Sequence, residues 1–65
     1  QRILAAIDQL ERFPNMGRIV PEHGREDVRE LVLAPYRIVY RRKPDVVVVL
    51  TIFRANRLLP ALPIE

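Results

Sequence analysis

The sequence has no cysteine, a single histidine and no long hydrophobic run. Without cysteine, disulfides and thiolate metal sites are excluded, and nothing indicates an oxidising compartment. No apolar segment is long enough to cross a bilayer, and the chain does not open with a signal-peptide pattern. We therefore expect a cytoplasmic protein that has no membrane partner.

Several familiar catalytic patterns are also missing. The chain has no glycine-rich phosphate loop, no Ser-His-Asp set and no Cys-His pair. His23 lies in a Pro-Glu-His-Gly turn without the further ligands that a metal site needs, so we expect neither a metal nor a cofactor. Four acids lie close together in the sequence and could supply a general acid–base pair, but a solvated loop and strand start is the simpler interpretation. These acids are Glu22, Glu26, Asp27 and Glu30.

The chain contains enough apolar sequence for a small folded unit. It has 65 residues, of which 49% are hydrophobic and 29% charged, so we expect one small globular domain over residues 1–65. Its positive charge is concentrated in the second half. Residues 1–36 carry five arginines and six acids, whereas residues 37–57 carry six basic residues and one acid. Local basic charge of this kind favours an anionic partner.

The apolar spacing at the start of the chain predicts a helix over residues 2–12. Ile3, Ile7 and Leu10 recur at helical spacing and form one apolar stripe. The helical pattern begins at once, and no capping residue precedes it. We therefore expect the chain to be the C-terminal portion of a longer protein, or a shortened one.

The rest of the chain predicts a loop and three strands. Residues 14–27 contain two prolines and two glycines, which indicates a connecting loop. Strands are predicted over residues 28–33, 36–42 and 46–53, with turns at Pro35 and at Lys43-Pro44-Asp45. The predicted fold class is α+β: one N-terminal helix packed on a three-stranded antiparallel sheet.

Residues 46–53, "VVVVLTIF", are apolar on both faces, which is typical of a strand covered on both sides. The helix predicted over residues 2–12 can cover one face of the sheet. The other face is uncovered unless the proline-containing tail, "LLPALPIE", packs on it. An uncovered apolar face predicts association, either as a homo-oligomer through the open sheet or with a partner protein.

The middle strand, "YRIVYRR", has two different faces. Tyr36, Ile38 and Tyr40 point one way, where we expect core packing with the hydroxyl groups on polar partners. Arg37 and Arg41 point the other way. Arg18, in the preceding loop, is expected to bind the nearby acids and so to be structural.

Three segments in this order carry a resemblance to a known family. They are "FPNMGRIVPE", "VRELVLAPYRIVYR" and "IFRANRLLP". Together with the preceding helix they resemble the RelE/ParE toxin superfamily of bacterial toxin–antitoxin systems, over residues 1 to about 60. The family fold begins with a further strand and helix, which have no counterpart in this chain. Where the family has a histidine followed by an arginine near the last strand, this chain has Arg54 and Arg57.

The resemblance implies a toxin of a type II toxin–antitoxin system, with a role in plasmid stabilisation or addiction, neutralised by a cognate antitoxin. The "FPNMGR" segment and the leucine–proline ending look more like ParE, whose members inhibit DNA gyrase. A RelE-type endoribonuclease that cuts mRNA on the ribosome is the first alternative. An inactive, truncated interaction module is the second.

The candidate site consists of basic side chains. As catalytic residues of the RelE-type alternative we expect Arg37, Arg54 and Arg57, because guanidinium groups match phosphate oxygens and can neutralise a transition state without histidine. As the binding surface for an anionic partner we expect Arg37, Arg41, Arg54 and Arg57. The competing interpretation is a solvated basic sheet edge.

Overall fold

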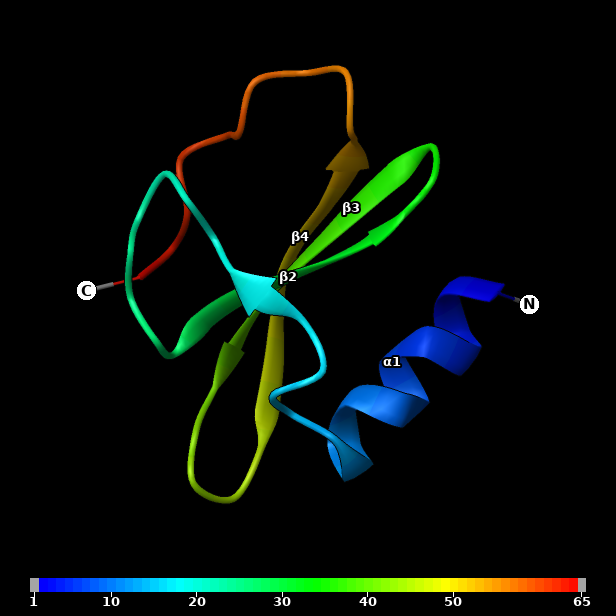
Figure 1. Ribbon diagram of the computed structural model, residues 1–65, viewed down its shortest axis with the longest axis vertical. Coiled ribbons are helices and arrows are strands. Elements are labelled where there is room, and N and C mark those ends of the chain that lie inside the picture. The colour runs from blue at the N-terminus through cyan, green and yellow to red at the C-terminus, as the bar shows by residue number, and fades with distance from the viewer. Residues whose placement is uncertain (1, 65) are drawn as a thin grey trace.

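The helix and the main strands lie where the side-chain pattern predicts them. The computed structural model describes residues 2–64, and no helix in this part of the chain is long and apolar enough to cross a membrane. The elements are α1 (Arg2–Arg12), β1 (Arg18–Ile19), β2 (Val28–Leu33), β3 (Tyr36–Arg42) and β4 (Val47–Arg54). All neighbouring strands pair antiparallel, in the order β1-β2-β3-β4 (Figure 1). The predicted α+β class is confirmed.

The sheet has four strands where the sequence predicted three. The additional strand, β1, lies inside the predicted loop and pairs with Glu30 and Arg29 of β2. A strand of two residues is too short to show an alternating pattern, and it exists because its backbone finds a partner in β2. The last strand is also displaced by one residue, since β4 spans Val47–Arg54 instead of residues 46–53.

Helix α1 covers one face of the sheet (Figure 1). Ala6 and Leu10 from the helix meet Ile38 and Tyr40 from β3, and all four are buried. The partly buried side chains around them come from the helix and from two strands, β2 and β4: Ile3, Leu31, Leu33, Val47 and Val49. We call this side of the sheet the helix face. The helix is held there by its apolar stripe, as the spacing of the sequence predicts.

A hydroxyl group fixes the segment that follows the helix onto the same face. Tyr40 is fully buried, and its hydroxyl accepts a hydrogen bond from the Gly17 N–H (3.0 Å) and donates one to the Pro14 carbonyl (2.6 Å). Gly17 lies so close to the backbone of β2 that no side chain fits there, because a Cβ would be 2.5 Å from the Glu30 carbonyl oxygen. The expectation that Tyr36 and Tyr40 pack in the core with their hydroxyls on polar partners is confirmed for Tyr40, whereas Tyr36 is only partly buried.

The C-terminal tail covers the opposite face, which we call the tail face (Figure 1). Its buried centre consists of Val20, Val28 and Val39. Side chains of β4 and of the tail pack around it: Leu50, Phe53, Leu59, Leu62 and Ile64. The apolar face that the sequence left without a certain cover is therefore covered by the chain's own tail.

An irregularity in β4 supplies both faces with apolar side chains. Val39 pairs with Thr51 while Tyr40 pairs with Val49, so Leu50 is an extra residue in β4. Such a bulge changes which side the following residues face. Leu50 packs on the tail face and Val49 on the helix face.

Replacing Tyr40 by Phe tests the hydroxyl contact. The change leaves the Gly17 N–H and the Pro14 carbonyl without their buried partner, which costs about 1–3 kcal/mol in the free energy of unfolding. Urea unfolding measures this loss. The matched control is Tyr36→Phe, which should change stability by less than about 0.5 kcal/mol, as is usual at sites without such contacts. Equal effects of the two substitutions would contradict the assignment.

Two neighbouring leucines test the packing of the tail. Leu59 packs on the tail face, whereas Leu58 is 94% exposed. Leu59→Ala should therefore lower the free energy of unfolding by about 1–2 kcal/mol, and Leu58→Ala should leave it within about 0.5 kcal/mol. If thermal or urea unfolding gives the same result for both variants, the tail does not cover the sheet in solution.

Candidate interaction site

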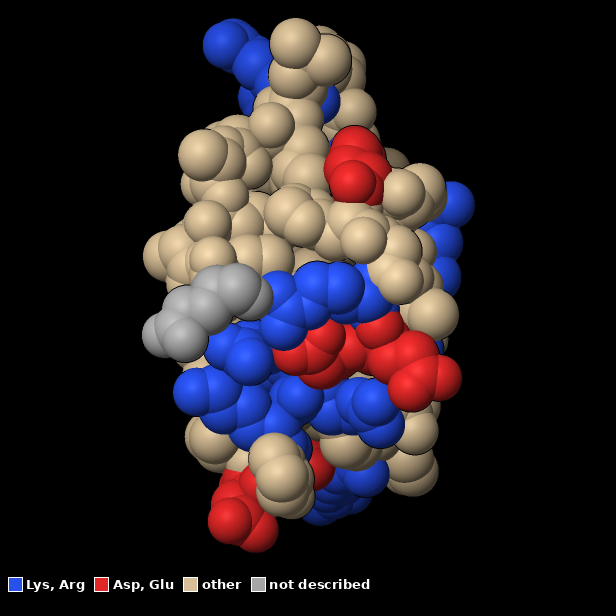
Figure 2. Space-filling view, turned by 90° about the vertical axis from the view of Figure 1, so that its left-hand side faces the viewer, with Lys and Arg blue, Asp and Glu red and all other residues tan. Residues whose placement is uncertain are grey.

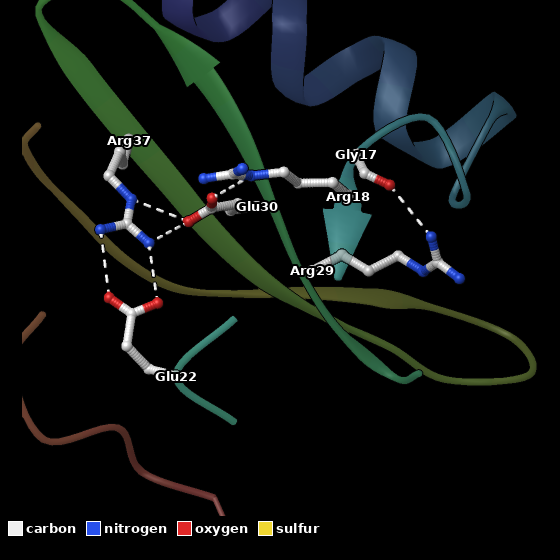
Figure 3. Close-up of polar contacts among 6 residues, drawn as sticks. All are labelled: Gly17, Arg18, Glu22, Arg29, Glu30 and Arg37. Carbon is white, nitrogen blue, oxygen red and sulfur yellow. Dashed lines mark hydrogen bonds and ion pairs between the residues drawn. The ribbon is translucent and has the colours of Figure 1, made fainter. Parts of the chain in front are cut away.

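A buried carboxylate lies at the centre of the polar side chains. Glu30, in the middle of β2, is 1% exposed and points to the tail face with Val28. It accepts a hydrogen bond from Arg18 Nε (2.5 Å) and two from the Arg37 guanidinium, of which the one from Nε measures 2.7 Å (Figure 3). The expectation of a solvated Glu30 is wrong. A carboxylate at this depth is retained only where cations and hydrogen bonds satisfy it.

Arg37 connects this buried carboxylate to the loop before β2. One edge of its guanidinium binds Glu30, and Nη1 and Nη2 reach the two oxygens of Glu22 at 3.5 and 3.4 Å (Figure 3). Its guanidinium also lies over the Phe53 ring, 5.1 Å from the centroid. The Arg37 side chain is consequently only 12% exposed.

The directions of the pKa shifts of Arg37 and Glu22 follow from their contacts. Burial lowers the pKa of Arg37, but the hydrogen bonds to Glu30 and Glu22 outweigh burial and raise the pKa above its ordinary value. A hydrogen bond from its own backbone N–H, and then the one from Arg37, lower the pKa of Glu22 below 4.5. Both groups are therefore charged near neutral pH, and the Arg37 charge is compensated within the fold.

Arg41 belongs to a second cluster on the same face. Its Nε donates to an Asp27 oxygen (3.0 Å), and Arg25 binds both oxygens of that carboxylate at 3.0 and 2.8 Å. The hydrogen bond from Arg25, followed by that from Arg41, lowers the pKa of Asp27 below 3.8. Figure 2 shows the result, because basic and acidic side chains lie interleaved across the middle of this side of the molecule.

The last two predicted arginines lie elsewhere and have a different environment. Arg54 pairs with Tyr36 in the sheet, and its guanidinium lies over the Tyr36 ring, 5.6 Å from the centroid. The backbone N–H of Arg57 donates to the Arg54 carbonyl (3.0 Å) in the turn that follows β4. Both arginines are exposed, and within residues 2–64 neither forms an ion pair.

The predicted arginines thus form two groups instead of one patch. Arg37 pairs with Phe53 and lies on the tail face with Arg41, whereas Arg54 pairs with Tyr36 on the helix face. Alternation along β3 separates the two groups, since adjacent residues of a strand point to opposite sides. The structure therefore does not bring Arg37 and Arg54 together.

The remaining residues singled out in the sequence are structural or lie singly on the surface. Arg18 binds Glu30, which confirms its expected role in fixing the loop. His23 is an exposed loop residue. Among the residues that the structure describes, no three side chains of the metal-binding types are grouped. Sequence reasoning named Glu22 and Glu30 only as members of a solvated acidic group and missed their contacts with Arg37. A signal for the burial of Glu30 was its position between Val28 and Val32 on an apolar strand face.

The amino-acid sequence matches a known protein family over most of its length. A family model described as the ParE toxin of the type II toxin–antitoxin system, parDE, matches residues 1–59. The chain belongs to the ParE toxin family. The match includes the Phe13–Arg18 segment fixed by Tyr40, the Glu30 carboxylate and the Arg54–Arg57 turn. No match is found among curated proteins or solved structures.

Substitution of two carboxylates, Glu30 and Glu22, tests which contacts stabilise this ParE-family toxin. Glu30→Gln removes the buried charge and leaves Arg37 with only its longer contact to Glu22, so we expect a loss of about 3–5 kcal/mol in the free energy of unfolding. Glu22→Gln, the matched control, removes a partly exposed and longer contact, which costs less than about 1 kcal/mol. Chemical denaturation measures both. A loss below about 1 kcal/mol for Glu30→Gln would contradict a central role for the buried pair.

Proposed function

We propose that this ParE-family toxin acts by binding and inhibiting DNA gyrase, and that an antitoxin encoded beside it neutralises it. The observation that carries the choice of binding over RNA cleavage is the separation of Arg37 from Arg54 by the sheet. A phosphoryl transition state needs its cations around one reacting group. Arg37 is compensated by Glu30 and Glu22, so its charge is already engaged in the fold.

The exposed arginines after β4 are the residues we assign to binding the target. Arg54 and Arg57 have no acidic partner within residues 2–64, so their charge is available to an anionic surface. Arg41 is a secondary contact, since Asp27 is shared between it and Arg25. For the antitoxin we propose an acidic segment that folds as it binds, because the toxin supplies a rigid, positively charged surface. A plasmid-stabilising role would follow from such a toxin–antitoxin pair.

Expression in bacterial cells tests the proposal. The chain should arrest growth, and co-expression of the small gene beside it should restore growth. Purified chain should inhibit supercoiling by gyrase, and primer extension should find no new cuts inside the codons of translated mRNA. New cuts with normal supercoiling would support the RelE-type alternative instead. Equal growth with and without expression would support an inert module.

A double substitution tests the arginines directly. Arg54→Ala with Arg57→Ala should weaken gyrase inhibition at least about tenfold, which corresponds to losing about 1.4 kcal/mol of binding. The melting temperature should stay close to that of the parent, because both side chains are exposed. The matched control is Arg12→Ala with Lys43→Ala, which also removes two exposed positive charges and should leave inhibition unchanged. Parallel loss of stability and inhibition in the first variant would make these arginines structural.

A further inference from the structure

A small pocket lies where the start of α1 meets the turn between β2 and β3. Its volume is about 220 Å³. The helix contributes two of its residues and the turn region four: Arg2, Ile3, Leu33, Ala34, Pro35 and Tyr36. Aliphatic and ring carbons thus form most of the wall. We call it the turn pocket.

The turn pocket has a positively charged rim. Arg2 lines it directly, and the Arg54 guanidinium lies over the ring of Tyr36, another lining residue. Within the described residues neither arginine forms an ion pair, whereas Arg37 and Arg41 on the other face each bind a carboxylate. The uncompensated charge around an apolar pocket therefore favours an occupant that carries negative charge beside an apolar group.

Backbone contacts hold the pocket and its rim in place. The Ala55 N–H donates to the Pro35 carbonyl (2.8 Å), which fixes the end of β4 beside the pocket wall. The pairing of Tyr36 with Arg54 sets the position of the guanidinium in the same way. On the helix side, Ile3 packs against the buried cluster of the helix face. A partner would therefore bind a preformed site, which lowers the ordering cost of binding.

The size of the turn pocket limits what can fill it. Sites for whole small molecules usually measure about 300–1,000 Å³, and this pocket is smaller. It accommodates one side chain, and its walls offer few polar groups that could read the edge of a nucleobase. A single aliphatic side chain fits the apolar wall, and neighbouring carboxylates would reach Arg2 and Arg54.

We propose that the turn pocket anchors one aliphatic side chain of an acidic peptide segment, with carboxylates on either side of the anchor paired to Arg2 and Arg54. This deepens the proposed function and rests on it, since the antitoxin is the natural source of such a segment. It also gives Arg54 a second role, because the antitoxin would then occupy a residue that we assign to binding the target. Neutralisation would follow from direct competition.

Peptide titration followed by nuclear magnetic resonance tests the proposal on the isolated chain. The probe is acetyl-Glu-Leu-Asp-Glu-amide, added to the ¹⁵N-labelled 65-residue protein. We expect amide shifts concentrated at Ile3, Leu33 and Tyr36. The same peptide with alanine in place of leucine should bind about tenfold more weakly, since it loses the apolar anchor.

Two protein variants separate the pocket from its charged rim. Ala34→Leu fills the pocket from the turn and should weaken binding of the leucine peptide about tenfold, but not that of the alanine peptide. Arg54→Ala should weaken both peptides several-fold. Arg12→Ala, which removes an exposed arginine at the other end of α1, is the control and should weaken neither.

The proposal is wrong if the leucine and alanine peptides bind equally, or if the shifts spread over all basic residues. It is also wrong if AMP shifts the pocket resonances and the peptide does not, because the site would then accept a nucleotide. Peptide binding is measured without gyrase or cells. If the peptide does not bind but the chain inhibits gyrase, this inference alone is overturned. If the peptide binds but the chain does not inhibit gyrase, only the proposed target is overturned.

Discussion

The buried pair between Glu30 and Arg37 is the constraint on which the rest of the structure depends. A carboxylate this deep in a small sheet costs stability unless cations and hydrogen bonds satisfy it, and removing one partner leaves an uncompensated charge. Glu30 obtains its partners from β1 and β3 through Arg18 and Arg37. Arg37 in turn contacts Glu22 in the loop and the Phe53 ring in β4. One carboxylate therefore links three strands directly and the loop and β4 through its partner.

This arrangement determines which arginines remain available. On the tail face the acids of the loop and of β2 compensate Arg37 and Arg41, so the interleaved charges stabilise the fold. On the helix face the Arg54 guanidinium lies over the ring of Tyr36, and no acidic side chain within residues 2–64 compensates its positive charge. The two faces of the β3–β4 pair thus separate Arg37 and Arg41, which stabilise the fold, from Arg54, which we assign to binding a partner. The turn pocket lies beside the second set, where an acidic partner would meet both charge and an apolar cavity.

The sequence predicted the fold well because its signals are local. Apolar periodicity located α1, and alternation located β2 and β3 with their observed bounds. The separation of Arg37 from Arg54 depends on strand register, which alternation within one strand does not reveal. The burial of Glu30 depends on what covers its face, namely the tail and the side chains of Arg18 and Arg37. These are contacts between residues distant in the sequence, and of them the sequence predicted only that Arg18 binds nearby acids.

Hydrogen exchange of the arginine side chains tests the central claim most directly. In a ¹⁵N–¹H spectrum of the folded protein, the Nε–H of Arg37 should exchange slowly with water, because it is largely buried and bound to Glu30. The Nε–H of Arg54 should exchange fast, because that side chain is exposed on the other face. Equal and fast exchange of the two groups would show that the buried pair does not persist in solution, and would contradict the account.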